Sequence, residues 1–186
     1  MLRQSVDLAG AAARTLPDIV APGLRVLFCG INPGLYSAAT GYHFARPGNR
    51  FWPALHRSGF TARQLRPEEQ ELLLGSGLGI TNIAARATAR AAELSREELR
   101  EGAGLLAAKA AALRPAWLAF VGVSAFRTGF GRPLAAVGPQ PDPVSGSRVW
   151  VLPSTSGLNA HWTLAALAGE FARLRQAADG QPASAG

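Results

Sequence analysis

The sequence of 186 residues contains one cysteine, one lysine and only twelve acidic residues. A lone cysteine, Cys29, cannot form an intramolecular disulfide, and it cannot ligate an iron–sulfur cluster or a cysteine-bound zinc ion by itself. No run of about 18 consecutive apolar residues is present, and the first residues lack the pattern of a secretory signal. We therefore expect a cytoplasmic protein with no membrane partner.

The scarcity of acids leaves an excess of positive charge. Nineteen Lys and Arg against twelve Asp and Glu give a formal net charge of +7, which favours a polyanionic partner. All but one of the basic residues are Arg, the side chain suited to bidentate phosphate contacts. A GC-rich genome would produce the same bias, so charge alone does not decide between a nucleic-acid partner and none.

Short apolar runs alternate with helical patterns along the chain. Leu24 to Cys29, Trp117 to Val121 and Arg148 to Leu152 are typical of buried parallel strands, and Gly79 to Ile83 is a weaker fourth run. Helices are expected over 67–75, 95–113 and 164–174, and a further one carries Phe51, Trp52 and Leu55. The alternation predicts an α/β fold, a single-domain three-layer α/β/α sandwich with a short, mainly parallel sheet.

The ends of the chain look peripheral. We expect one domain over 1–186, with a core of about 22–178, an N-terminal lead over 1–21 and a flexible tail over 179–186. At the helix starts, Ser95 and Glu98 form a capping box, and Asn49 is expected to cap the helix that follows it.

The pentapeptide GINPG (Gly30 to Gly34) follows directly on the first expected strand. Ligands of open parallel sheets bind beyond the carboxyl ends of the strands. Pro33 fixes its own φ and pushes Asn32 out of the helical region, so the amide is held in one direction. An amide can hold a water or a carbonyl, but it cannot act as a general base as a carboxylate can. Taken alone, GINPG fits an ordinary turn, in which Asn32 caps its own turn, better than a functional site.

Four segments together resemble one known family. They are GINPGLYSAATGYHFARPGNRFW (30–52), GITNIAARAT (79–88), LSREELREGAGLL (94–106) and LPSTSGLNA (152–160). The sequence resembles the mismatch-specific uracil/thymine DNA glycosylases, a branch of the uracil-DNA glycosylase superfamily, over roughly residues 24–175. The resemblance implies a uracil-DNA glycosylase-like fold and an enzyme that flips a nucleotide into a pocket and hydrolyses its N-glycosidic bond.

The resemblance also implies roles for residues of the first motif. Asn32 would position the attacking water, Phe44 would stack on the flipped pyrimidine, and backbone N–H groups of the 30–37 loop would stabilise the departing base. The implied base-binding pocket comprises Gly30, Ile31, Gly34, Ser37, Phe44 and Asn82.

In the second motif, Leu158 would enter the gap left by the flipped nucleotide, and Gly157 and Asn159 would contact the base opposite. Candidate phosphate contacts are Arg46, Arg50, Arg86 and Arg90. For each of these residues a purely structural role is the alternative.

The sequence departs from the family pattern in three places. Asn32 stands where the highly active uracil-specific branch has an Asp, so slow turnover is expected. Ser154 and Thr155 replace the Asn-Pro of some relatives, and Asn82 replaces a Lys.

Because no acid lies inside either motif, Glu93 is a candidate for polarising the water, against the alternative of an exposed acid before a helix. His43 and His161 are candidate assistants, or structural hydrogen-bonding groups. Lys109, the only lysine, lies in an expected helix far from both motifs, so no Schiff base is expected.

These features predict a monomeric, monofunctional DNA glycosylase without metal or cofactor, which excises uracil, or other damaged pyrimidines, opposite guanine in double-stranded DNA. Two alternatives stay open: a catalytically weak module that binds mismatched DNA, and a Rossmann-like hydrolase that acts on free nucleosides.

Overall fold

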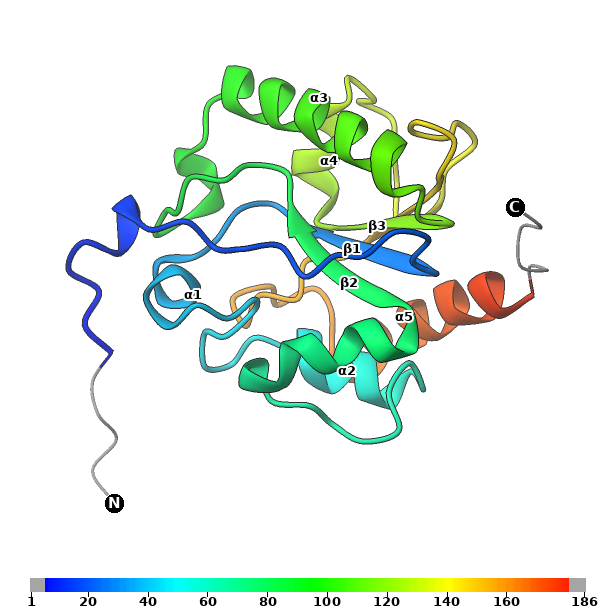
Figure 1. Ribbon diagram of the computed structural model, residues 1–186, viewed down its shortest axis with the longest axis horizontal. Coiled ribbons are helices and arrows are strands. Elements are labelled where there is room, and N and C mark those ends of the chain that lie inside the picture. The colour runs from blue at the N-terminus through cyan, green and yellow to red at the C-terminus, as the bar shows by residue number, and fades with distance from the viewer. Residues whose placement is uncertain (1–5, 181–186) are drawn as a thin grey trace.

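The computed structural model describes residues 6–180, and within that range it forms a five-stranded sheet (Figure 1). The strands are β1 (Val26–Gly30), β2 (Leu78–Asn82), β3 (Trp117–Val121), β4 (Gly138–Pro139) and β5 (Arg148–Leu152). Their order is β2-β1-β3-β5-β4, and only β4 pairs antiparallel with its neighbour. The predicted, mainly parallel sheet is confirmed.

Helices cover both faces of the sheet (Figure 1). On one face lie α3 (Arg96–Leu113) and α4 (Val123–Gly129), and on the other lie α2 (Phe51–Arg57) and α5 (Leu164–Asp179). Shorter elements are α1 (Leu35–Thr40) and the 3-10 helices η1 (Ala11–Ala13), η2 (Pro67–Ser76) and η3 (Ala91–Glu93). The α/β fold is thus confirmed. Between residues 6 and 180, no helix combines the length and the hydropathy needed to cross a bilayer.

Strand β1 shows why the core strands read as unbroken apolar runs. Phe28 points to the α2 and α5 side, where its ring centroid lies 5.4 Å from that of Phe51 and 5.8 Å from that of Phe171. The next residue, Cys29, points to the opposite side and packs in the cluster that contains Phe126. Every residue of β1 is buried, because helices cover both faces of the sheet.

The structure differs from the expectations in several elements. The segment expected as a helix over 67–75 is the 3-10 helix η2, and α1, α4 and β4 had no counterpart among the expected elements. Asp179, which was expected to begin the tail, is instead the last residue of α5, and its carboxylate binds Arg25 and Arg175.

The N-terminal lead is also more integrated than expected. Ile19 is buried and forms an antiparallel bridge with Ile80 of β2. The carboxylate of Asp18 accepts a hydrogen bond from Thr81 Oγ1 (2.7 Å) and pairs with Lys109 of α3. These contacts join Asp18 and Ile19 of the lead to the edge of the sheet. Residues 1–5 and 181–186 lie outside the described part.

Gly102 allows α3 to lie close to the segment that follows β2. A Cβ atom at this position would lie 2.2 Å from the carbonyl oxygen of Ile83, far inside van der Waals contact. Two residues further along the same helix, Gly104 is exposed and has open space around it. The two glycines therefore differ in packing but not in backbone conformation.

We predict opposite effects of alanine at these two glycines. Gly104→Ala should raise the free energy of unfolding by about 0.5 to 1 kcal/mol, because alanine is the better helix former. Gly102→Ala should lower it by about 1 to 3 kcal/mol, because the helix or Ile83 must shift. Urea denaturation of both variants measures the difference, and stabilisation by both would contradict the close approach of α3.

Candidate active site

A cavity of about 180 Å³ lies at the edge of the sheet where the parallel strands end. The segments that follow β1, β2 and β5 contribute most of its wall, and Val121 at the end of β3 and Leu16 of the N-terminal lead contribute the rest. Residues after β1 that line it are Ile31, Asn32, Pro33, Gly34, Ser37, His43, Phe44, Arg46 and Asn49. From the other segments come Leu16, Asn82, Thr88, Ala89, Ala91, Ser154, Thr155 and Ser156.

Most of the pocket residues expected from the sequence do line this cavity, and Gly30 lies directly beneath it. In the parallel register of β1 and β2, Gly30 is opposite Asn82. A Cβ atom on Gly30 would lie 2.4 Å from Asn82 Oδ1 and 3.4 Å from the ring of Phe44. Gly30 thus provides the room in which the Asn82 amide and the Phe44 ring lie side by side.

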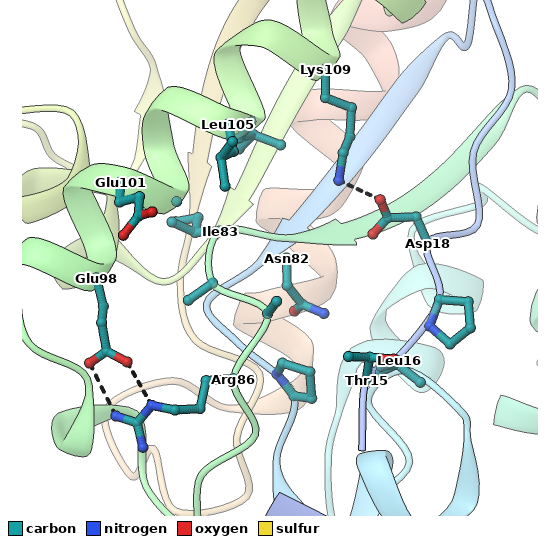
Figure 2. A pocket seen from close by; sticks show the side chains of 16 residues that line it. Thr15, Leu16, Asp18, Asn82, Ile83, Arg86, Glu98, Glu101, Leu105 and Lys109 are labelled. Carbon is teal, nitrogen blue, oxygen red and sulfur yellow. Dashed lines mark hydrogen bonds and ion pairs between the residues drawn. The ribbon is translucent and has the colours of Figure 1, made fainter. Parts of the chain in front are cut away.

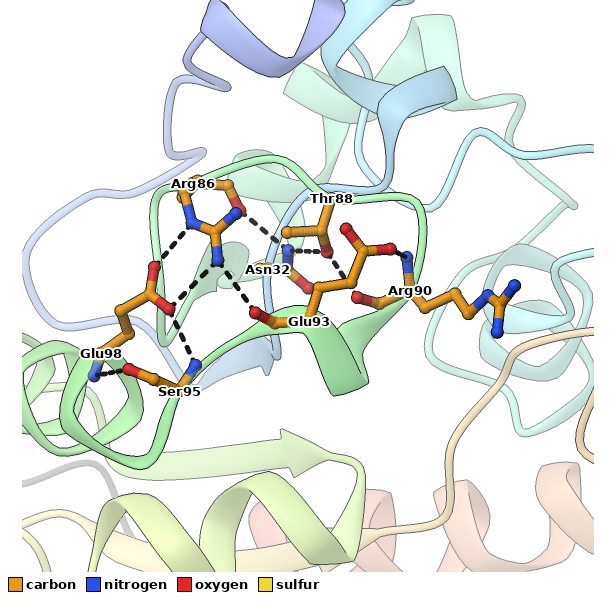
Figure 3. Close-up of polar contacts among 7 residues, drawn as sticks. All are labelled: Asn32, Arg86, Thr88, Arg90, Glu93, Ser95 and Glu98. Atoms are coloured by element: carbon orange, nitrogen blue, oxygen red, sulfur yellow. Dashed lines mark hydrogen bonds and ion pairs between the residues drawn. The ribbon is translucent and has the colours of Figure 1, made fainter.

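Backbone and hydroxyl oxygens determine the orientation of the Asn32 side chain. Its Nδ2 donates to the carbonyl of Arg86 (2.8 Å) and to Thr88 Oγ1 (2.7 Å), as Figure 3 shows. Thr88 Oγ1 in turn donates to the carbonyl of Arg90 (2.8 Å). A carbonyl can only accept, so the amide nitrogen must face Arg86, and Oδ1 is left free of hydrogen bonds to the described residues.

Phe44 is held against the core by one face of its ring. It stacks on Phe51 with ring centroids 4.1 Å apart and planes 16° apart. Its φ of 52° lies in the left-handed region, which is uncommon for an aromatic residue. Such conformations persist where the surrounding structure holds them in place and are common at functional sites.

His43 has a structural role. Its ring is buried, and its Nε2 lies 2.8 Å from the carbonyl of Pro17, which can only accept a hydrogen bond, so Nε2 carries the proton. Its backbone N–H donates to Gln70 Oε1, and its carbonyl accepts from Trp52 Nε1. Burial lowers the pKa of His43 below its usual value, so the ring is neutral at physiological pH. The other histidine of interest, His161, is exposed on the loop after β5.

Glu93 is not part of the cavity wall. Its side chain is exposed, and Oε1 accepts a hydrogen bond from the backbone N–H of Arg90 (2.9 Å) at the start of η3. The sequence hypothesis that Glu93 polarises a water is therefore unsupported by the geometry. The carboxylate instead caps the turn that leads into α3 (Figure 3).

Arg86 also has protein partners. Its Nε donates to Glu98 Oε1 (2.6 Å), and its Nη2 donates to Glu98 Oε2 (3.1 Å) and to the carbonyl of Glu93 (3.0 Å). This fork, with the N–H of Ser95 as a second donor, lowers the pKa of Glu98 to about 2. The pair fixes the backbone of Arg86, whose carbonyl holds Asn32. Arg46 and Arg90, the other candidate phosphate contacts in this region, are exposed.

The loop after β5 carries Leu158 at its tip. Leu158 is 77% exposed, and the neighbouring residues Ser154, Thr155 and Ser156 line the cavity. Gly157 is exposed as well. The amide of Asn159 is used within the loop: Nδ2 donates to Ser154 O (2.9 Å), and Oδ1 accepts from the N–H of His161 (3.3 Å).

Arg50, expected to contact phosphate, instead points into this loop. Its guanidinium donates to the carbonyls of Ser156 (2.6 Å), Asn159 (2.8 Å) and Trp162. Its Nε is buried without a partner. The neighbouring Asn49 behaves as expected, because its Oδ1 accepts from the N–H of Phe51 (2.9 Å) at the start of α2.

A second, wider cavity of about 480 Å³ lies beside the first, between the N-terminal lead and α3 (Figure 2). Asn82 lines both cavities. The ion pair of Lys109 with Asp18 lies at one side, and the pair of Arg86 with Glu98 lies at another. Lys109 is thus engaged in an ion pair away from the first cavity. Among residues 6–180 no group of three His, Cys, Asp or Glu side chains could hold a metal ion.

Comparison with known families agrees with this geometry. The profile of the family described as the uracil DNA glycosylase superfamily matches residues 17–177. The chain belongs to the uracil DNA glycosylase superfamily. The resemblance seen in the sequence is confirmed at the level of this superfamily.

A solved structure shares the fold of this uracil DNA glycosylase superfamily member. It is the solution NMR structure of a proposed uracil DNA glycosylase from Methanosarcina acetivorans, with a TM-score of 0.58 and 20% sequence identity. The match covers 87% of this chain and 98% of that chain. At this identity the likeness concerns the fold.

Sequence analysis missed two contributions to the site of this superfamily member. Thr88 lies within a recognised motif, but nothing in the sequence shows that its hydroxyl meets Asn32, 56 residues away. Arg50 reads as a surface cation, and its partners are backbone carbonyls more than 100 residues away. Backbone acceptors leave no trace in residue identity, so only the structure reveals these contacts.

We predict that Glu98→Gln lowers the melting temperature most at neutral pH. The pKa of Glu98 is about 2 in the folded protein and about 4.3 in an unfolded chain. Its stabilising effect is therefore present above about pH 4.3 and is lost as the pH falls toward 2. Melting temperatures of Glu98→Gln and wild type, measured from pH 7 down to 2.5, should converge.

The matched control is Glu97→Gln, which removes an exposed carboxylate from the same helical turn. Its effect should be small at every pH. A Glu98→Gln difference that does not change with pH would contradict the role of the Arg86 ion pair.

Proposed function

We propose that the protein is a monofunctional DNA glycosylase of the mismatch-specific kind, which removes uracil opposite guanine from duplex DNA by base flipping and hydrolysis. The observation that carries the proposal is the Asn32 side chain, whose nitrogen is held by two oxygens while its oxygen remains free in a cavity lined by Phe44 and Asn82.

A free amide oxygen at this place suits a water nucleophile. Asn32 Oδ1 can accept one hydrogen bond from a water and so fix its position beside the sugar of a flipped nucleotide. The open face of Phe44, whose other face stacks on Phe51, gives a flat apolar surface for the pyrimidine. The Asn82 amide has both donor and acceptor atoms for the polar edge of the base.

The cavity wall holds no carboxylate to deprotonate the water. Its one histidine, His43, keeps its Nε2 proton toward Pro17, and burial lowers its pKa, which makes Nδ1 a weak base. The reaction must therefore draw its rate from departure of the base as an anion that N–H donors stabilise. The water positioned by Asn32 then adds to a sugar that already has cation character, which demands little activation.

The exposed Leu158 supports action on duplex DNA in preference to free nucleosides. Apolar side chains that enter a base stack fill the space of the displaced nucleotide, and Leu158 projects from a loop whose Ser154, Thr155 and Ser156 line the cavity. The net charge of +7 favours the same polyanionic partner.

The first test is single-turnover excision from an end-labelled duplex with one G·U pair, followed by alkali to cleave abasic sites. Wild type should yield product, and Asn32→Ala should lose about a hundredfold or more in rate, the usual effect of removing one aligned catalytic group. Gln140→Ala serves as the control, because it removes an amide that binds only the carbonyls of Ala136 and Gly138, away from the cavity wall.

No product from folded wild type, together with tight and salt-sensitive binding of the G·U duplex, would leave a binding module. Excision from free deoxyuridine at the same rate as from duplex would indicate a nucleoside hydrolase. Equal rates for wild type and Asn32→Ala would contradict the role given to Asn32.

Thr88→Val tests how the amide of Asn32 is held. The substitution keeps the shape of the side chain but removes the oxygen that accepts from Asn32 Nδ2, so the amide can rotate. We expect a loss of about ten- to a hundredfold in the single-turnover rate, with little change in the enzyme concentration that gives half the maximal rate.

Thr88→Ser, which keeps the hydroxyl, should stay close to wild type. If Val and Ser variants lose the same activity, packing at position 88 and not the hydrogen bond would be responsible.

A further inference from the structure

The loop over residues 153–162, which carries Leu158, is joined to the rest of the protein in an unusual way. Four hydrogen bonds cross from this loop to other parts of the described chain, and Arg50 is the donor in all of them. Its backbone N–H donates to Thr155 O (2.9 Å), and its guanidinium donates to the carbonyls of Ser156, Asn159 and Trp162. The loop's other hydrogen bonds are internal to it.

A close backbone contact adds to this connection. A Cβ atom on Gly157 would lie 2.8 Å from the carbonyl oxygen of Gly48, two residues before Arg50. The loop over residues 46–50 and the 153–162 loop therefore touch without side chains between them. Gly48 and Arg50, near the end of the first motif, thus both contact the loop of the second motif, and Arg50 makes its hydrogen bonds.

The Arg50 guanidinium is well suited to holding the 153–162 loop and poorly placed to bind a DNA phosphate. Its fork of N–H donors can bind several carbonyls at fixed angles, and bonds from a charged donor are stronger than neutral ones. Arg50 makes no ion pair within residues 6–180, and its Nε is buried. Both terminal nitrogens are bound to the loop, which leaves little of the side chain for a DNA phosphate.

We propose that Arg50 is a positioning residue that holds the 153–162 loop in the conformation from which Leu158 enters the DNA stack. This inference rests on the proposed function for the step in which Leu158 acts, but the ordering of the loop does not depend on DNA. Without the guanidinium, the loop must be ordered at the moment of binding, and the entropy cost falls on nucleotide flipping.

The experiment has a part without DNA. Hydrogen exchange of free Arg50→Ala, followed by mass spectrometry, should show faster exchange over 153–162 and unchanged exchange over β1, β3 and α3. Arg57→Ala is the matched control, because it removes an exposed Arg from the last turn of α2, beyond the loops that form the cavity. It should leave exchange over 153–162 as in wild type.

The second part is a double-mutant cycle on single-turnover excision from the G·U duplex. Arg50→Ala should lower the maximal rate about ten- to a hundredfold, the scale of losing a charged hydrogen bond. Leu158→Ala should also lower it, because it removes the apolar side chain that fills the stack. The double variant should lose no more than the worse single variant, because a displaced loop makes the wedge ineffective.

Arg50→Lys separates the carbonyl contacts from charge alone. A lysine keeps the positive charge but cannot reach three carbonyls with a rigid fork, so it should remain as impaired as alanine. A phosphate contact would give the opposite pattern: Lys would restore activity, and Ala would reduce the slope of log affinity against log salt by about one.

Gly157→Ala covers the case in which Arg50 variants fail to fold. Its Cβ must push the loop away from Gly48, so it should reproduce the slow excision without loss of a charge. Unchanged exchange over 153–162 in folded Arg50→Ala, or strictly additive losses with Leu158→Ala, would overturn the inference. Faster exchange in Arg50→Ala, with no excision by wild type, would uphold the ordering of the loop and reject the proposed glycosylase.

Discussion

The Asn32 amide nitrogen lies against a carbonyl, which can only accept, and a hydroxyl whose proton goes to the carbonyl of Arg90, and this one constraint orients the centre of the site. It holds only while the Arg86 carbonyl and the Thr88 hydroxyl stay in place. The segment after β2 that carries both is fixed at its start by the contact of Gly102 with Ile83 and further along by the fork of Arg86 on Glu98. Helix α3, which follows β2, thus helps to orient the Asn32 side chain on the loop after β1.

The sequence allowed good prediction of the elements that depend on burial. Strands β1, β3 and β5 are almost entirely apolar because helices cover both sheet faces, whereas β2 is a weaker run. Helices α3 and α5 carry their caps and apolar stripes in the sequence. The elements that the sequence did not predict are short. Helix α4, with seven residues, and the two-residue strand β4 are too short to show a period. The lead was misjudged because the contacts of Asp18 with Thr81 and Lys109 link positions 63 and 91 residues apart.

For the site, the sequence indicated which segments meet but not how they are joined. The motif around Asn32 and the loop with Leu158 both follow parallel strands, and parallel strands end at the same sheet edge, so their approach could be anticipated. Whether an arginine faces DNA or protein could not, because that depends on where carbonyl groups of another loop point. Arg50 and Arg86 both bind within the protein, so under the proposed function the exposed Arg46 and Arg90 are better candidates for phosphate contacts.

A cavity wall without a carboxylate also bears on which bases can be removed. If the enzyme cannot deprotonate its water, it can break only those glycosidic bonds whose base departs readily as an anion. Uracil spreads the negative charge over two carbonyls, whereas an unmodified cytosine or adenine is a poorer leaving group. Undamaged DNA is then protected by the weakness of the chemistry as well as by the shape of the cavity. Thymine leaves almost as readily as uracil, so under the proposed function its rejection within A·T pairs must come from the shape of the cavity or from the flipping step. We propose that Leu158 and the loop that Arg50 holds act in that step.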